Sequence, residues 1–147
     1  MSDPSHPAIR ARGGCLCGGV RYEIRGPLRD VRACHCSQCR RTSGHFVAAS
    51  QALNADLVLL ESATLRWYRS SGEAERGFCE RCGGNLFWRP TAPGSDVTSI
   101  MAGTLDAPTG LRVMHHIFIA DKSDYYEITD GAPQSAQRWS EPSSRVR

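Results

Sequence analysis

The seven cysteines are the residues of this sequence best suited to chemistry, because none stands apart from a cluster. Thiolate sulfur is a favoured ligand of zinc, which takes four ligands in structural sites and three protein ligands in catalytic ones. Two pairs and a triplet can therefore make one closed four-thiolate site and one three-thiolate site with an open position. The pairs are Cys15 with Cys17 and Cys79 with Cys82, and the triplet is Cys34, Cys36 and Cys39.

The chain length and composition describe the setting of these cysteines. A chain of 147 residues fits one domain, and its hydrophobic share of 40% is low enough that bound metal is expected to contribute to stability. The first twelve residues lack an apolar signal core, and no stretch approaches the ~20 apolar residues of a membrane span. We therefore expect a cytoplasmic protein with no membrane partner, in which clustered cysteines stay reduced and bind metal or act in redox chemistry.

The charge pattern narrows the choice of partners. A net charge of +3 is a mild bias, and it gives no case for a nucleic-acid partner, for which a concentrated basic stripe is expected. Arginine far outnumbers lysine, since Lys122 is the single lysine. This excess suits recognition of carboxylate or phosphate, although genome composition explains it equally well.

Short alternating runs dominate the sequence, and glycine or proline interrupts them about every ten residues. This pattern predicts a mainly β fold, such as a sandwich or barrel, with little helix. The predicted strands are residues 20–24, 31–34, 45–49, 57–60, 65–68, 86–88, 97–101, 116–120 and 125–128.

The two cysteine pairs are expected to share one ion. Residues two apart in an extended segment point to the same side, so one ion can take both sulfurs of the pair that begins at Cys15. The pair that begins at Cys79 has the outline of a zinc knuckle, with two thiolates across a tight turn followed by glycines. Four thiolates close a tetrahedral structural site. Such a site would link the first strand to the middle of the chain.

The triplet can hold a second ion and leave its fourth position open to water or substrate. Spacing leaves an alternative open, in which both C-x-C pairs share one ion and Cys39 joins Cys79 and Cys82 on the other. Two further interpretations remain: a redox-active C-x-x-C pair, and two purely structural sites in which a histidine completes the second.

Four stretches carry a family resemblance: GGCLCGGVRYE, CHCSQCRRTSG, FCERCGGNLFW and HHIFIADKSDYYEITDGAPQ. Together they resemble the glutathione-dependent formaldehyde-activating enzymes, a family that includes the centromere protein V domain. The resemblance runs from about Gly13 to Gln134. It implies a zinc-stabilised antiparallel β-tent, a structural zinc on Cys15, Cys17, Cys79 and Cys82, and a catalytic zinc on Cys34, Cys36 and Cys39.

The resemblance also implies a reaction, in which glutathione and formaldehyde join to give S-(hydroxymethyl)glutathione. Written in reverse, this is a carbon–sulfur lyase reaction. A zinc with an open position can lower the pKa of a bound thiol or polarise the aldehyde oxygen. Three thiolates weaken the ion as a Lewis acid, so we favour thiol activation, with a small thiol such as glutathione as partner. The alternative function is a non-catalytic zinc module that binds a protein or nucleic acid.

Polar residues beside the triplet are candidates for substrate binding. Arg40 and Arg41 could hold carboxylates of a glutathione-like peptide, or could be solvated loop cations. Thr42 and Ser43 could donate hydrogen bonds to substrate.

The histidines are candidates for a fourth ligand or a proton carrier. His35 should point away from the metal if its segment is extended, which leaves His45, His115 and His116.

Three segments are expected along the chain. Residues 1–12 are predicted to be a flexible N-terminus, and 13–134 the zinc-binding β domain. Residues 135–147 are predicted to be a mobile tail, unless Trp139 docks on the domain.

Overall fold

The fold is known from a computed structural model, which describes residues 8–138. This part of the chain is mainly β, as the sequence predicted, with a single α-helix, α1 (Ser37–Ser43), and three short 3-10 turns. The strands are β1 (Ala11–Gly14), β2 (Arg21–Ile24), β3 (Val31–Cys34), β4 (Val47–Leu53), β5 (Leu57–Glu61), β6 (Leu65–Arg69), β7 (Ala74–Cys79), β8 (Asn85–Pro90), β9 (Val97–Met101) and β10 (Val113–Ile117).

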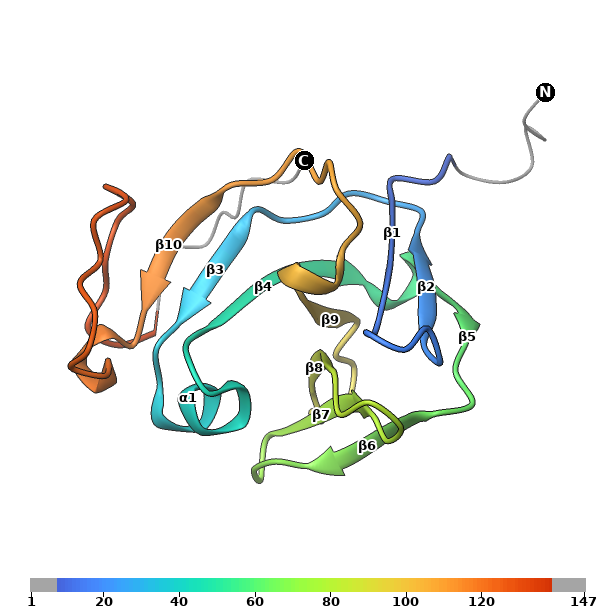
Figure 1. The fold of residues 1–147 in the computed structure, drawn as a ribbon, viewed down its shortest axis with the longest axis horizontal. Coiled ribbons are helices and arrows are strands. Elements are labelled where there is room, and N and C mark those ends of the chain that lie inside the picture. Colours follow the sequence, from blue (N-terminus) through green and yellow to red (C-terminus); the bar gives the residue numbers. More distant parts are fainter. Residues whose placement is uncertain (1–7, 139–147) are drawn as a thin grey trace.

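The strands form two sheets. The smaller sheet has the order β1-β2-β5, and the larger has the order β10-β3-β4-β9-β8-β7-β6. Neighbouring strands pair antiparallel, with one exception, since β10 runs parallel to β3. Figure 1 shows the larger sheet curling from β10 at the left to β6 at the bottom, with α1 below β3 and β4 and the smaller sheet at the right. The predicted antiparallel β architecture is therefore confirmed.

The larger sheet has two unlike faces, because successive side chains of a strand point to opposite sides. One face contributes Ala52, Phe87 and Ile100 to the main hydrophobic core. From the smaller sheet come Tyr22 and Ile24, which are fully buried in the same core. This core fixes the two sheets against each other and leaves the opposite face of the larger sheet free to build a site.

The opposite face can be followed from strand to strand by its register. Cys34 of β3 pairs with Val47 of β4, and Ala49 of the same strand pairs with Met101 of β9. Further along, β9 pairs with β8, and Trp88 of β8 pairs with Arg76 of β7. Residues of five strands thus meet on one surface.

Several elements differ from the sequence prediction. Strands β1 and β7 and the helix α1 were not predicted, and the strand predicted at 116–120 lies earlier, at Val113–Ile117. Residues 125–128 are not in a strand. In β7, the register shifts between Gly77 and Phe78, which interrupts the alternation that reveals a strand in sequence.

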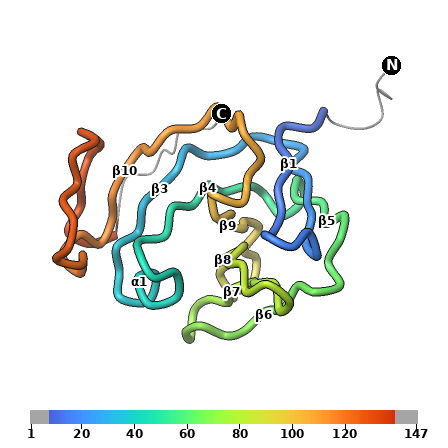
Figure 2. The backbone as a smooth tube through the Cα atoms, in the orientation of Figure 1, coloured from blue at the N-terminus to red at the C-terminus, as the bar shows by residue number. Residues whose placement is uncertain are grey.

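The segment after β10 folds back along it. The backbone N–H of His116 donates to Pro133 O at 2.9 Å, and that of Ser135 donates to His116 O at 2.9 Å. The N–H of Phe118 donates to Gln137 O. Figure 2 shows this stretch in orange and red beside β10. Ordered contacts therefore extend past residue 134, the boundary that we predicted for the domain.

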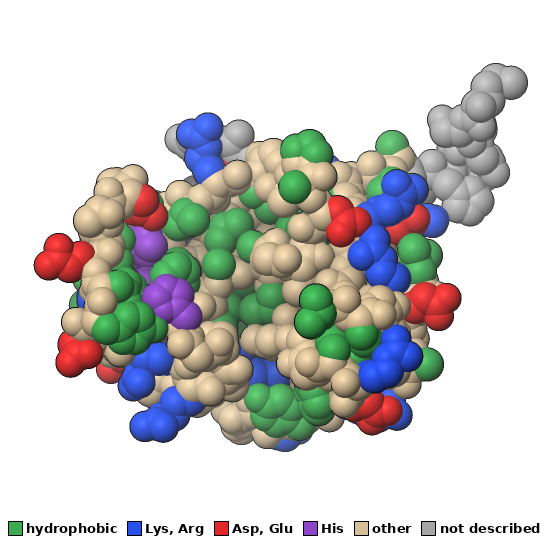
Figure 3. Space-filling view, viewed as in Figure 1, with side chains coloured by type: hydrophobic (Ala, Val, Ile, Leu, Met, Phe, Trp, Pro, Cys, Tyr) green, Lys and Arg blue, Asp and Glu red, His purple; other side chains and the backbone are tan. Residues whose placement is uncertain are grey.

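At the other end, β1 begins at Ala11, inside the segment 1–12 predicted to be flexible. The remaining residues of the two predicted terminal segments, 1–7 and 139–147 with Trp139, lie outside the described residues. Within residues 8–138, no helix is long and apolar enough to cross a membrane. On the face drawn in Figure 3, lysine and arginine side chains are scattered among acidic and neutral ones.

Candidate functional site

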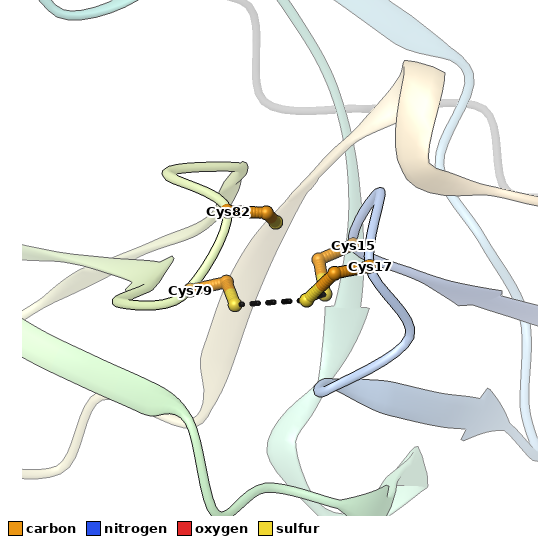
Figure 4. Close-up of side chains that lie close together, drawn as sticks. All are labelled: Cys15, Cys17, Cys79 and Cys82. Atoms are coloured by element: carbon orange, nitrogen blue, oxygen red, sulfur yellow. Dashed lines mark hydrogen bonds between the residues drawn. The ribbon is translucent and has the colours of Figure 1, made fainter.

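The four cysteines of the two pairs meet at one point, although more than sixty residues separate the pairs. Their Sγ atoms all lie within 4.8 Å of one another. The Sγ of Cys17 is 3.6 Å from those of Cys15 and Cys79, as Figure 4 shows for the contact with Cys79. A disulfide needs about 2.0 Å, whereas zinc–sulfur bonds of about 2.3 Å in a tetrahedron place the sulfurs about 3.8 Å apart. The geometry therefore fits a four-thiolate metal site, which we call the clamp.

Tight turns hold the clamp together. The N–H of Gly83 donates to Cys79 O at 2.8 Å, and Gly83 has a φ of +76°, a conformation that L side chains rarely adopt. This turn presents both thiols of the C-x-x-C pair on one side, as a zinc knuckle does.

Neighbouring polar groups favour the thiolate form of two clamp cysteines, whereas burial raises the pKa of a third, Cys15. A hydrogen bond with Thr64, 3.2 Å away, is the main cause that lowers the pKa of Cys79 to about 6. The pKa of Cys17 is also lowered, by the backbone N–H of Gly19 and by Arg81, whose Nε donates to the sulfur at 3.2 Å. Thiolates are the form that binds a metal ion.

The triplet forms the second cluster, and a helix start shapes it. Cys34 ends β3, Cys36 caps the N-terminus of α1, and Cys39 lies in the first turn. The Sγ of Cys36 accepts a hydrogen bond from the N–H of Cys39 at 3.4 Å, and the three Sγ atoms lie within 4.8 Å of one another. Contacts with Cys34 and then Cys39 lower the pKa of Cys36, and the contact with Cys36 raises that of Cys34.

The structure thus gathers the seven cysteines into the two groups that the spacing favoured, and not into the alternative grouping. Both groups fit a metal ion. Among residues 8–138, no histidine, carboxylate or further cysteine joins either group.

A cavity of about 470 Å³ opens beside the triplet. All three cysteines line it, together with the face of the larger sheet that points away from the main core. Val47, Met101 and Trp88 make part of the wall apolar. Its charged lining residues are Arg29, Arg32, Glu73, Arg76, Asp121 and Arg138.

The four residues predicted to bind substrate lie on α1 and do not line this cavity. The hydroxyl of Thr42 donates to Gln38 O, and that of Ser43 donates to Cys39 O at 2.8 Å. Arg41 is exposed. The structure thus shows two of these side chains bonded to the helix, and the binding role of Arg40, Arg41, Thr42 and Ser43 stays a prediction.

The histidines form hydrogen bonds away from the two clusters. His35 points away from the triplet, as expected, and its Nδ1 pairs with the hydroxyl of Tyr126. Its Nε2 lies 2.9 Å from Nδ1 of His116, whose Nε2 donates to Asp130 at 2.8 Å. Burial, and then the nearby His116, lower the pKa of His35 to about 4. This network fixes the backbone between Cys34 and Cys36.

The other two candidates are engaged as well. Nδ1 of His45 lies 2.5 Å from the hydroxyl of Tyr125, and Nε2 of His115 lies 2.7 Å from that of Ser135. No histidine of the described residues therefore completes the triplet.

Comparison with known proteins decides the family. The family model described as glutathione-dependent formaldehyde-activating enzyme matches residues 10–121 of this chain. This chain belongs to that family. The matched range includes both cysteine clusters and all the strands of the two sheets.

Two relatives illustrate the likeness. An uncharacterized lyase of Schizosaccharomyces pombe is 29% identical over 119 residues, which cover 80% of this chain and 85% of the relative. A crystal structure of a Rhodobacter sphaeroides protein, a Northeast Structural Genomics target, matches with a TM-score of 0.54 at 28% identity. That match covers 65% of this chain and 88% of the other.

The charged residues of the cavity were not found by sequence reasoning. Arg76 lies far from the triplet in sequence, and no motif surrounds Arg29 or Arg32. The sequence signal for Arg76 was indirect, because it lies three residues before Cys79, on the strand that leads into the C-x-x-C turn.

Proposed function

We propose that this protein is a zinc-dependent carbon–sulfur lyase or synthase that acts on thiol–aldehyde adducts. The family default is formation of S-(hydroxymethyl)glutathione from glutathione and formaldehyde. The observation that carries the proposal is the triplet, in which three thiols converge at the wall of a cavity large enough for a small substrate. The clamp would hold a structural zinc and the triplet a catalytic one.

The proposed reaction consists of one bond formation and one proton transfer. The carbon–sulfur bond forms as the thiol sulfur attacks the carbonyl carbon, and the sulfur's proton ends on the aldehyde oxygen. Cys34, Cys36 and Cys39 would hold the ion, and the chemistry that it would supply is a lower pKa for a bound substrate thiol.

The chain's own residues hold and orient the reactants. Cys34, Cys36 and Cys39 fix the place where the substrate sulfur would lie. The apolar wall formed by Val47 and Trp88 limits the water around a small aldehyde. His35, held by His116 and Tyr126, keeps the ligand loop in one conformation.

The Cys36→Ser variant tests this proposal. We expect it to lose about one zinc per chain and to lose glutathione binding, measured by metal analysis and calorimetry. Exchange between formaldehyde and its glutathione adduct, followed by NMR, should fall to the uncatalysed rate.

Cys82→Ser is the matched control, since it makes the same change in the clamp. It should also lose zinc and should be less stable, but its folded fraction should still bind glutathione. Unchanged glutathione binding by Cys36→Ser would contradict the proposal. A protein or nucleic-acid partner that binds equally well without the triplet ion would favour the non-catalytic module.

A further inference from the structure

Arg76 is a buried charge with no acidic partner in the part of the chain that the structure describes. It lies in β7, at the wall of the cavity, and is 2% exposed. Its Nη2 donates to the Sγ of Cys39 over a long 3.7 Å. Its Nε and Nη1 are fully shielded from solvent and have no hydrogen-bond partner among the described residues. The ion pairs of residues 8–138 engage other arginines.

Burial of an unpaired guanidinium at this position costs folding free energy. The guanidinium stays protonated in proteins, it offers five N–H donors, and burial removes the water that would satisfy them. Natural proteins rarely bury arginine unless it is paired. The donors of Arg76 therefore indicate an anion that occupies the cavity during function.

The charges of the other cavity-lining residues also favour an anionic ligand. Arg29 lines the same wall, and its side chain is held by hydrogen bonds to Asp30 O and Ala49 O. The acidic residues of the lining, Glu73 and Asp121, are both exposed. The buried charges of the wall are thus positive.

The position of Arg76 relative to the triplet suggests which anion. Because one N–H of Nη2 contacts Cys39, an anion bound by Nη1 and the other N–H of Nη2 would lie about one guanidinium width and one hydrogen bond from the cysteine sulfur. A carboxylate two or three bonds from a thiol spans such a gap. Arginine also matches carboxylate geometry, because the parallel N–H groups of Nη1 and Nη2 can meet its two oxygens.

We propose that Arg76 binds a carboxylate of the substrate thiol and thereby selects thiols that carry a carboxylate near the sulfur, ahead of glutathione, whose carboxylates both lie far from its sulfur. This inference rests on the proposed function, since it assumes that a thiol binds at the triplet. It assigns recognition to a strand residue on the sheet, whereas the sequence pointed to Arg40 and Arg41 on the helix.

A different role would be as a counter-ion to the three thiolates, through the contact with Cys39. The two roles differ in one measurable respect. A counter-ion affects every thiol that binds at the triplet, whereas a carboxylate ligand affects only thiols that carry the anion.

Two small thiols with the same ethylene linker between the sulfur and the polar group separate these roles. The probes are 3-mercaptopropionate, which carries a carboxylate, and 2-mercaptoethanol, which carries a hydroxyl in its place. We expect the metal-loaded protein to bind the first more tightly in calorimetry. Arg76→Gln should weaken 3-mercaptopropionate about ten- to hundredfold and leave 2-mercaptoethanol within about twofold, since hydrogen bonds to charged groups are strong.

Further variants complete the design. Arg89→Gln is the matched control, because Arg89 lies on the neighbouring strand, pairs with Glu75 and does not line the cavity. It should change neither affinity. Arg76→Lys should restore part of the preference, and Arg76→Met should unfold at the same or a higher temperature than the native protein, because it removes an unpaired buried charge.

The outcomes are distinct. Equal weakening of both thiols by Arg76→Gln, or no weakening of either, would overturn the carboxylate role. If neither thiol binds to the native protein, the proposed function fails, and this inference fails with it. Should Arg76→Gln not fold, the same comparison between Arg76→Lys and the native protein decides.

Discussion

The clamp joins distant parts of the chain, and its contribution to stability can be predicted. Cys17 and Cys79 are 62 residues apart, whereas Cys34 and Cys39 are five apart. The entropy cost of closing a loop grows as 1.5RT times the logarithm of its length, so the longer loop costs the unfolded chain about 2.2 kcal/mol more. An ion that stays on the clamp thiolates when the chain unfolds imposes that cost on the unfolded state, and so stabilises the native state.

The test compares two double variants that each remove two thiols. Cys79→Ala with Cys82→Ala opens the clamp, and Cys36→Ala with Cys39→Ala opens the triplet. We expect the first pair to lower the unfolding free energy by about 2 kcal/mol more than the second, in urea titrations with saturating zinc. With m-values of 1–3 kcal/mol/M, the midpoints should differ by roughly 1 M. Equal midpoints would refute the crosslink argument.

Three further predictions concern single side chains, each measured by chemical denaturation. Gly44→Ala should cost about 1–2 kcal/mol, because Gly44 ends α1 with a φ of +81° and no neighbour blocks a Cβ there. Phe87→Ala should cost about 3–5 kcal/mol, because Phe87 is fully buried in the main core. Tyr22→Phe should cost about 1 kcal/mol at neutral pH through loss of the 2.7 Å hydrogen bond with Thr104. Burial raises the pKa of Tyr22 to about 12, so above pH 10 the unfolded state loses this proton first. The unfolding free energy of the native protein should then fall by up to about 1.4 kcal/mol per pH unit more than that of Tyr22→Phe.

Local patterns in the sequence predicted the cysteine groups and most strands. C-x-C and C-x-x-C spacings bring two sulfurs together by local geometry, so the identity of each pair needed no tertiary information. Alternation revealed strands such as β2 and β9, since one face of each is buried in the core. The helix α1 was missed because it is only seven residues long and its N-cap is Cys36, which is not among the usual capping residues.

The cavity required information that no local pattern contains. Arg76 and Cys34 share a surface because β3, β4, β9, β8 and β7 lie side by side in that order. Strand order is a property of the whole chain, and β10 reaches β3 only through a parallel pairing. The sequence therefore predicted which cysteines gather, and it placed the predicted substrate contacts on the helix next to them, where the structure shows hydrogen bonds of Thr42 and Ser43 within α1.

Strand β7 links the cavity to the clamp. It carries Arg76 in its middle and Cys79 at its end, so one strand belongs to the cavity wall and to the clamp. An ion held by the clamp would fix the end of β7, and the pairing of β7 with β8 would pass that restraint to the cavity wall. The order of the cavity wall would thus depend on the same ion that stabilises the fold.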